Sequence, residues 1–493
     1  MTESRLPIAV IGAGPVGLAA AAHLIDRSET PIVLEAGDRV ASSVRQWAHV
    51  RMFSPWEYCI DPAAARLLDG AGWQPPARDG LPTGGELVAR YLEPLAELPA
   101  MRPRIKLGTR VTAISRKGHD KVRSNGRDAQ PFVLRTDGGG GEQVIEAKAV
   151  IDASGTWTTP NPSGADGLPA IGEAAAAQHI VYGIPDVLGD LRARYAGRTT
   201  LVIGGGHSAI NALVELAALK RLEPSTRIVW AMRKERADAA YGGGAADQLP
   251  ARGALGTQAR ALVESGEVEV ITPFRVSRIA AGSSSGVRVT GTHANAERTV
   301  AVDEIVVATG LRPDLSFLRE LRLTLDPWLE SSGSIGPLID PNLHSCGTVR
   351  PHGARDLAHA EPGFYIAGMK SYGRAPTFLL ATGHEQVRSI VASLVGDTAA
   401  AERVELKLPE TGVCTTRPVD TARADPAAGC CGGPSVEPNA CCVADAEAKA
   451  AGEAGCGCGT ASARTAKVPA AGCSAPAKAA TPKPAAGGCC GSA

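Results

Sequence analysis

The sequence predicts an α/β fold in which two similar parallel-sheet domains precede a disordered C-terminal tail. A glycine-rich turn between an apolar strand and a helix occurs twice, once near the start of the chain and once near its middle. Each copy is followed by alternating strands that end in a similar motif, AVIDASG or EIVVATG. This internal similarity indicates two homologous, Rossmann-like dinucleotide-binding domains, each with a β-meander.

The first glycine turn lies in IAVIGAGPVGLAAAAHL, where the strand 8–11 runs into Gly12, Gly14 and Gly17 in the spacing GxGxxG. The first glycine makes the tight turn, the second lets the backbone approach a pyrophosphate, and the third lets the helix pack on the strand. The phosphates then meet the positive N-terminus of the helix. Glu35 follows the next strand at the distance where an acid accepts hydrogen bonds from a ribose. The sequence therefore predicts a dinucleotide site here.

The second glycine turn lies in TTLVIGGGHSAINALVELA, with Gly204, Gly206 and Ala209 in the related spacing GxGxxA. The strand after it, RIVWAM, is followed by a basic cluster that includes Arg233 and Lys234 instead of by an acid. Cations at this place would pair with a 2′-phosphate, which predicts NADPH rather than NADH. The alternative is a solvated loop with ordinary surface charge.

The strands after each glycine turn repeat one plan. PFVLRTD, a turn at 138–141 and EQVIEAKAVIDASG predict a hairpin that feeds a buried strand, and the segment from VEVITPFRVSRIA to EIVVATG does the same. Thr83 and Glu86 fit a capping box that opens the helix ELVARYLEPLAEL. After Gly310 the chain must return to the first domain for a strand, a glycine turn at Gly368 and a long helix. The expected boundaries are 1–160 for the first part of the first domain, 161–197 for a linker, 198–310 for the second domain, 311–400 for the return segment and 409–493 for the tail.

The composition excludes several functional classes. A chain of 493 residues allows about three units at ~150 residues per domain, and 44% apolar residues are enough for real cores. A formal net charge of zero gives no sign of a nucleic-acid or membrane-surface partner. The first apolar run is already the strand of the first glycine turn, and no apolar stretch reaches ~18 residues. We therefore expect a soluble, cytoplasmic protein.

Together these motifs resemble those of flavoproteins with two dinucleotide-binding domains. Within that group the chain is similar to flavin-containing, class B-type NADPH-dependent monooxygenases, especially the flavin-binding monooxygenases of bacterial arsenic-resistance operons. The resemblance covers roughly residues 5–400, through the glycine turns, both strand-end motifs and GFYIAGMKSYGRAPTF. It implies FAD on the first turn and NADPH on the second. The expected cofactor-binding residues are Gly12, Gly14, Gly17, Glu35, Trp47, Arg51, Ser54, Gly204, Gly206, Ala209, Arg233, Lys234, Gly310, Gly368 and Met369.

The linker departs from the pattern of these monooxygenases. Their fingerprint has the form FxGxxxHxxx followed by an aromatic residue, whereas this chain has IGEAAAAQHIVYG, with Ile171, Gly172, His179 and Tyr182. The spacing from glycine to histidine is longer and the leading aromatic is missing. Monooxygenation therefore does not follow from this motif alone, and an ordinary linker or surface role for His179 stays open.

Disulfide reduction is the competing chemistry, and it needs a cysteine pair against the flavin. The predicted domains hold only Cys59 and Cys346, which are far apart in the sequence. Cys59 is expected as a small buried hydrophobe, and Cys346, which has histidines and glycines around it, as a ligand or active-site candidate. The acid or base of the reaction stays unknown, with His207, His352 and Cys346 as candidates.

The tail after residue 409 is rich in Ala, Gly, Pro and Cys, a composition that cannot bury a core. Clustered cysteines in a reducing compartment favour soft metal ions or transient redox chemistry over structural disulfides. Their spacing does not fit a zinc finger, so trivalent arsenic or mercury is the expected ion. An electron relay and an inert extension are the alternatives. The expected metal ligands are Cys430, Cys431, Cys441, Cys442, Cys456, Cys458, Cys489 and Cys490.

These observations predict an FAD- and NADPH-dependent oxidoreductase, monooxygenase-like and linked to arsenic or metal detoxification. Its partners would be molecular oxygen and a small substrate such as an arsenical or another soft metal species, and a homodimer stays open. One alternative is a metal or disulfide reductase that uses the tail cysteines as a relay. The other is a non-catalytic, metalloid-binding flavoprotein, since fold likeness does not decide function.

Overall fold

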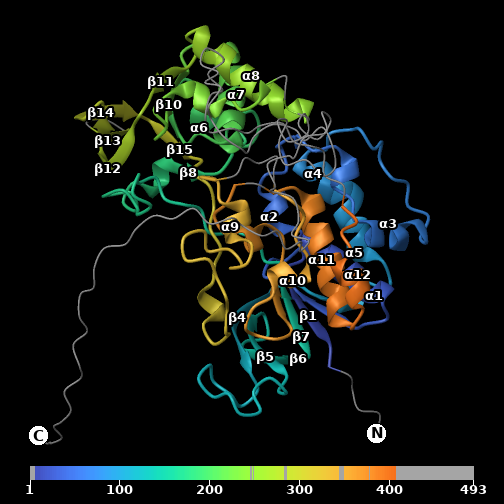
Figure 1. Cartoon of the computed structure of the whole chain (residues 1–493). Helices are drawn as coiled ribbons and strands as arrows, with labels where there is room; N and C mark the ends of the chain where they lie inside the picture. The colour runs from blue at the N-terminus through green and yellow to red at the C-terminus, as the bar shows by residue number, and fades with distance from the viewer. Residues whose placement is uncertain are drawn as a thin grey trace, which may run out of the picture. The chain divides into compact units, whose positions relative to one another are not determined.

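A computed structural model describes residues 6–244, 247, 249–282, 286–343, 349–376 and 378–406. The tail 409–493 lies outside these residues. Within the described ranges the chain forms two five-stranded parallel sheets and two three-stranded antiparallel sheets (Figure 1). The predicted α/β class with two Rossmann-like domains is confirmed.

The first parallel sheet is assembled from both ends of the described chain. Its strands pair in register, with Ile8 opposite Pro31 on one side and Ala149 on the other. In spatial order they are β16 (Phe364–Ile366), β7 (Ala149–Asp152), β1 (Ile8–Ile11), β2 (Pro31–Leu34) and β3 (Ile105–Lys106). The chain therefore returns to this sheet through β16 after completing the second one.

Four strands of the second parallel sheet repeat the order of the first, and the fifth strand comes from an earlier segment of the chain. The strands of this second sheet are β11 (Glu269–Ile271), β10 (Arg227–Ala231), β9 (Thr199–Ile203), β15 (Glu304–Val307) and β8 (Ile180–Tyr182). The edge strand β8 comes from the segment 161–197 that we expect as a linker, so this segment contributes to the sheet by pairing with β15.

Each parallel sheet is accompanied by an antiparallel meander. The first consists of β4 (Thr109–Arg116), β5 (Phe132–Gly138) and β6 (Gln143–Ala147). The second consists of β12 (Arg275–Ala281), β13 (Val287–His293) and β14 (Ala296–Val302). The first meander follows β3 and precedes β7, and the second follows β11 and precedes β15, as the repeated sequence plan predicts.

The helices follow the sequence signals for their ends. The capping box predicted at Thr83 is confirmed, since the Glu86 amide donates to Thr83 Oγ1 at 3.1 Å and the Thr83 amide donates to Glu86 Oε2 at 2.7 Å. A π-helix at Val88–Leu92 continues α4 into α5. The α-helices are α1 (Pro15–Asp26), α2 (Ser42–Arg45), α3 (Pro62–Asp69), α4 (Gly84–Leu87), α5 (Glu93–Glu97), α6 (Arg192–Tyr195), α7 (His207–Leu222), α8 (Pro250–Glu264), α9 (Gly336–Ile339), α10 (Ala354–Leu357), α11 (Leu380–Leu394) and α12 (Thr398–Glu402).

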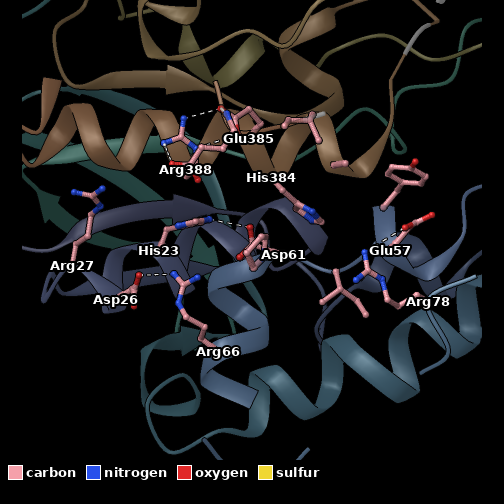
Figure 2. Close-up of a pocket in the computed structure, with 16 residues that line it drawn as sticks. His23, Asp26, Arg27, Glu57, Asp61, Arg66, Arg78, His384, Glu385 and Arg388 are labelled. Carbon is pink, nitrogen blue, oxygen red and sulfur yellow. Dashed lines mark hydrogen bonds and ion pairs between the residues drawn. The ribbon is translucent and has the colours of Figure 1, made fainter. Parts of the chain in front are cut away.

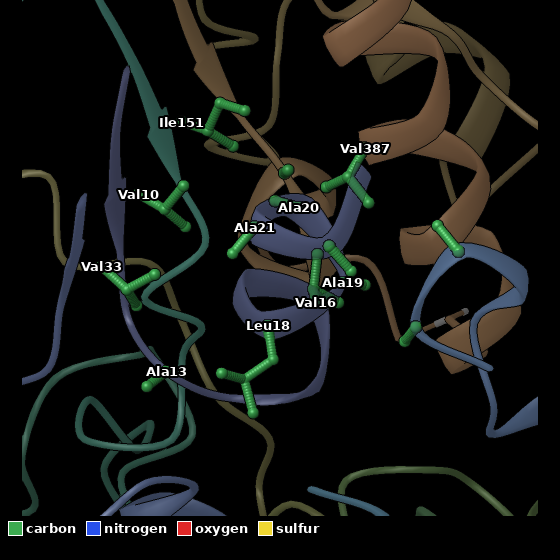
Figure 3. Close-up of a cluster of buried hydrophobic side chains, with 14 of the residues drawn as sticks. Val10, Ala13, Val16, Leu18, Ala19, Ala20, Ala21, Val33, Ile151 and Val387 are labelled. Carbon is green, nitrogen blue, oxygen red and sulfur yellow. The ribbon is translucent and has the colours of Figure 1, made fainter. Parts of the chain in front are cut away.

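Helices from the two ends of the described chain share one hydrophobic core. The orange helix α11 lies beside the blue helix α1 in Figure 1, and the two helices are in contact. A Cβ atom at Gly383 would lie 2.6 Å from Val16 Cγ2, so glycine permits their close approach. Val10, Val33 and Ile151 of the sheet and Val387 of α11 belong to the same buried cluster (Figure 3). Each such side chain contributes ~1.5–3 kcal/mol through burial.

In the described part of the chain, no helix combines the length and the apolar character needed to cross a membrane.

Candidate functional site

A cavity of about 680 Å³ opens at the carboxyl ends of β1, β2 and β7. Gly12 follows β1, Glu35 follows β2 and Ser154 lies beyond the end of β7, and all three line the cavity. β1 lies between β2 and β7 in the sheet. The chain adds β2 and β3 on one side of β1 and later adds β7 and β16 on the other side, so the strand order switches at β1. Open α/β sheets bind ligands at such a switch point, and the volume lies in the range of ligand sites.

The first glycine turn has the geometry that its spacing predicts. Gly12 has φ 96°, a conformation that favours glycine, and an added Cβ would lie 2.8 Å from Ala153 O. A Cβ at Gly17 would lie 1.9 Å from Gly12 O, whereas a Cβ at Gly14 would meet no atom within 4 Å. Gly14 lines the cavity and α1 begins directly after it. The residues present therefore fit a pyrophosphate approaching the start of α1.

Glu35 holds the glycine turn in place from the neighbouring strand. Its Oε2 accepts from the Ala13 amide at 2.7 Å and its Oε1 accepts from the Gly37 amide at 2.8 Å. Carboxylate oxygens have further lone pairs, so Glu35 retains acceptor capacity toward a ligand hydroxyl. The side chain is buried and borders the cavity.

Two tryptophans line the same cavity. The rings of Trp47 and Trp157 have centroids 6.5 Å apart and are tilted by 53°, and Trp157 Nε1 donates to Gln46 Oε1 at 2.8 Å. Gly368 and Met369, expected near the flavin, also line the cavity. This arrangement presents large apolar surfaces that would exclude water from a ring system bound there.

Two other residues expected near the flavin lie outside the lining of this cavity. Arg51 is 60% exposed and donates to Leu81 O at 2.5 Å. Ser54 is buried, and its carbonyl accepts from the Cys59 thiol at 3.6 Å. The structure therefore brings Trp47, but neither of these two, to the cavity wall.

A buried ion pair supports the cavity wall from behind. Lys370 Nζ donates to Asp152 Oδ2 at 2.7 Å and to Ser154 Oγ at 3.0 Å, and the Lys370 and Asp152 side chains are fully buried. Lys370 Nζ also lies 4.4 Å from the ring centroid of Phe317, which lines the cavity. Sequence reasoning missed this pair, because no local pattern separates a buried lysine from a surface one.

The second glycine turn repeats the geometry of the first. Gly204 has φ 140°, and an added Cβ would lie 2.2 Å from Ala308 O. A Cβ at Gly206 would meet no atom within 4 Å, and Ala209 is fully buried in α7. Gly310 has φ 95° and lies three residues beyond the end of β15, at the same edge of this sheet. The second turn therefore also leaves open space at the residue that precedes its helix.

The basic cluster follows β10, as its sequence position predicts. Arg233 Nη1 donates to Ala165 O at 2.9 Å, and Lys234 Nζ donates to Ala239 O at 2.5 Å. Arg233 is exposed. Because each guanidinium carries five donors, the hydrogen bond to Ala165 leaves Arg233 donors for a phosphate.

The two described histidine candidates lie in different surroundings. His207 opens α7 and its ring centroid lies 5.3 Å from that of Phe53. Burial, with the nearby Arg252 and Lys234, lowers the pKa of His207. His352 is fully buried beside the Tyr372 hydroxyl at 3.0 Å, and burial lowers its pKa to about 4. Neither residue lines the cofactor cavity.

The linker histidine and tyrosine make contacts within the protein. His179 Nδ1 lies 3.0 Å from Asp303 O, and Tyr182 donates to Glu173 Oε1 at 2.6 Å. A Cβ at Gly172 would lie 2.2 Å from Ile279 O. Ile171 pairs with Arg278 in an isolated bridge. These residues attach the segment before β8 to the second domain.

Cys59 is the one free cysteine in the described part of the chain. Burial raises the pKa of its thiol to about 12, so it is not a reactive thiolate. Cys346 and all expected metal-binding cysteines lie outside the described residues. Within the described ranges, no group of three or more His, Cys, Asp or Glu residues is arranged to hold a metal ion.

Comparisons with known proteins agree with this architecture. A family model described as pyridine nucleotide-disulphide oxidoreductase matches residues 9–332. A search of curated proteins returns no significant match. The predicted cofactors, FAD and NADPH, agree with this result, because the family description names a pyridine nucleotide and the chain has two glycine turns.

Solved structures of low sequence identity share the fold. The bacillithiol disulfide reductase Bdr (YpdA) from Bacillus cereus is 19% identical, with a TM-score of 0.59 over 80% of this chain and 100% of that one. The FAD-bound cadaverine monooxygenase DfoA from Erwinia amylovora is 12% identical, with a TM-score of 0.58 over 85% and 100%. The ornithine N-hydroxylase from Kutzneria sp. 744 is 16% identical, with a TM-score of 0.54 over 79% and 99%. One fold thus carries both disulfide reduction and hydroxylation.

Proposed function

Because the chain belongs to the pyridine nucleotide-disulphide oxidoreductase family, we propose that it is an FAD-dependent oxidoreductase that uses NADPH in a monooxygenase-like reaction. The observation that carries this proposal is the cofactor cavity itself. Its glycine turn leaves open space for a pyrophosphate, and none of the described residues that line it is a cysteine. With no thiol among these described lining residues, we infer that molecular oxygen, rather than a disulfide, accepts the electrons.

Each part of the site has a role in this proposal. Gly12 and Gly14 would hold the pyrophosphate of FAD at the start of α1, and Glu35 would accept from its ribose. Gly206 and Arg233 would hold the pyrophosphate and 2′-phosphate of NADPH. Bound FAD supplies the electron transfer that no side chain performs. Trp47 and the tryptophan beside it would exclude water, while the protein orients the two nucleotides.

We extend the proposal to an arsenical or another soft metalloid as the substrate. Ten of the 12 cysteines of the chain follow residue 413, and thiolates favour soft ions. The resemblance to monooxygenases of arsenic-resistance operons supports the same substrate class. The tail would capture or buffer the ion without taking part in electron transfer.

The family description favours a second candidate, a metal or disulfide reductase in which tail cysteines carry electrons from the flavin. A reaction of this kind proceeds without oxygen and requires the tail thiols. A third candidate, a metalloid-binding flavoprotein without catalysis, binds the ion tightly and oxidises negligible NADPH.

One experiment separates these three candidates. NADPH oxidation by the purified protein is measured with and without oxygen, in the presence of arsenicals or of disulfides. The same measurement is repeated after deletion of residues 409–493 and with the ten tail cysteines replaced by serine. The monooxygenase predicts substrate-dependent turnover that requires oxygen and survives the serine replacements at saturating substrate. Turnover that persists without oxygen and is lost with the cysteines contradicts it and supports the reductase.

A further inference from the structure

A second cavity, of about 490 Å³, lies between the end of α1, the start of α3 and the helix α11 (Figure 2). None of the described residues that line it also lines the cofactor cavity. Its volume lies in the range of small-molecule sites. It is therefore a separate candidate site, which the proposed oxidoreductase function does not use.

The inner wall of this cavity contains a buried polar cluster. His23 Nε2 lies 2.9 Å from Asp61 Oδ2, and Asp61 Oδ1 accepts from the Ala64 amide at 2.9 Å, which caps α3. The Asp61 amide in turn donates to the Tyr91 hydroxyl at 3.0 Å. Asp61 and His23 therefore use their hydrogen-bonding groups on each other and on the backbone around α3.

His384 is the member of this cluster without a full set of partners. It lies on α11, lines the cavity and is only 5% exposed, and its Nε2 has no hydrogen-bond partner among the described residues. Figure 2 shows its ring extending from α11 toward the segment that carries Asp61. Leaving a buried polar nitrogen unpaired is unfavourable, so its position points to a ligand that completes it.

The rim of the cavity carries paired charges of both signs. Arg66 and Asp26 are 2.7 Å apart, whereas Arg78 and Glu57 are 3.5 Å apart and more loosely held. Four guanidinium groups and five carboxylates line the cavity in total, which gives a balance of one negative charge if the histidines are neutral. The charged groups are Arg27, Arg66, Arg78, Arg388, Asp26, Glu57, Asp61, Glu385 and Glu405.

This charge pattern restricts the ligand. A polyanion such as phosphate would meet five carboxylates, and a polycation would meet four guanidinium groups. No described group of three His, Cys, Asp or Glu residues here can hold a metal ion. A molecule that carries one carboxylate and one ammonium group matches both signs without changing the net charge.

We propose that this cavity binds a small zwitterion of the free α-amino acid class. The Arg78–Glu57 pair is the longer of the two rim pairs described above. Because Arg78 is 84% exposed, separating these two side chains requires less free energy than separating Arg66 from Asp26. Arg78 then binds the ligand carboxylate and Glu57 binds its ammonium group. His384 completes the polar contacts at the inner wall.

Ligand binding here stabilises two helices that also reach the cofactor cavity. Val16 near the start of α1 and Leu380 at the start of α11 line the cofactor cavity. His23 and His384, farther along the same helices, line the second cavity. An occupied second cavity therefore raises the melting temperature of the whole described unit by mass action.

The test is a binding measurement on the full-length protein saturated with FAD and NADP⁺, so that phosphate cannot act through the proposed nucleotide sites. Free L-amino acids are screened one at a time by thermal shift, and hits are titrated by calorimetry, with inorganic phosphate and MgCl₂ as comparison arms. We expect a concentration-dependent rise in melting temperature with at least one amino acid and none with phosphate or MgCl₂. Arg78→Gln and Glu57→Gln should each weaken binding about tenfold or more, since each removes a charge-assisted contact.

A matched control shows whether the loss is specific. Arg192→Gln removes an exposed pair with Glu223 that lies outside the cavity, and it should leave the affinity unchanged. All three variants should retain the melting temperature and flavin content of the wild-type protein before ligand is added. The proposal is overturned if no amino acid binds, if phosphate or MgCl₂ produces the shift instead, or if Arg78→Gln binds as tightly as wild type.

Discussion

Alanine at Gly14 and alanine at Gly17 should separate cofactor binding from folding, because the two glycines have different surroundings. A Cβ at Gly17 would lie 1.9 Å from Gly12 O, a backbone atom that moves only with the whole turn. A Cβ at Gly14 meets no atom within 4 Å, and Gly14 lines the cofactor cavity. Gly17→Ala therefore acts on the fold, and Gly14→Ala acts on the cofactor.

The expected magnitudes follow from these contacts. Overpacking by the Gly17→Ala methyl group should lower the free energy of unfolding by ~1–3 kcal/mol or more. Gly14 has φ −80° and ψ −175°, which alanine also adopts. Alanine at this helix N-cap costs ~0.5–1 kcal/mol, and the loss of unfolded-chain entropy offsets ~0.4–1 kcal/mol of that cost. Loss of a charge-assisted hydrogen bond to the pyrophosphate, ~1.5–3 kcal/mol, weakens FAD binding by about ten- to a hundredfold.

The assay compares both variants in FAD-free and FAD-bound form. Urea denaturation of the FAD-free proteins gives the free energy of unfolding, and quenching of flavin fluorescence gives the Kd for FAD. Wild-type FAD affinity in Gly14→Ala would refute the placement of a pyrophosphate at the start of α1. Unchanged unfolding of Gly17→Ala would refute the close packing of α1 on the turn.

Three further changes test other parts of the structure. Lys370→Met leaves Asp152 buried without its ion-pair partner and should lower the free energy of unfolding, measured in urea, by ~3–5 kcal/mol. Adding Asp152→Asn should recover part of this loss. A loss below ~1 kcal/mol contradicts the buried pair. Arg233→Ala should raise the Kd for NADPH about tenfold or more and leave that for NADH unchanged, and an equal effect on both nucleotides contradicts a 2′-phosphate site. Burial beside Asp186 raises the pKa of Glu215 from 4.5 to about 7. Between these pH values the folded protein keeps a proton that the unfolded chain releases. The free energy of unfolding therefore falls as the pH rises from 4.5 to about 7. Glu215→Gln should remove the part of this pH dependence that Glu215 causes, as measured by urea midpoints. If the midpoints of the variant and the wild type fall in parallel, the raised pKa of Glu215 is contradicted.

Much of the fold could be predicted from the sequence because its main signals are local. The glycine spacing specifies a strand, a tight turn and a helix within about twenty residues. The structure has this strand, turn and helix at both places, with open space at Gly14 and Gly206. The return of the chain through β16 was also predictable, because the segment after Gly310 repeats the strand and glycine-turn pattern. Strand β8 could not be predicted from the sequence, because its three residues form a strand only through pairing with β15.

The candidate site was less predictable where it depends on distant contacts. Lys370 and Asp152 are separated by 218 positions, and only the folded chain brings their side chains together. Trp157 reaches the cavity beside Trp47 through the turn after β7, which no periodicity indicates. Arg51 shows the converse. It belongs to the same sequence motif as Trp47, four residues farther along, but its side chain is exposed and lies outside the cavity lining.

Anaerobic mixing of the FAD-loaded protein with NADPH tests the central claim most directly, because it asks whether the two nucleotides exchange electrons on this chain. We predict that the visible flavin absorption bleaches and that Arg233→Ala slows the bleaching at low NADPH concentration. A protein that takes up no FAD, or whose flavin absorption is unchanged by NADPH, would contradict the account.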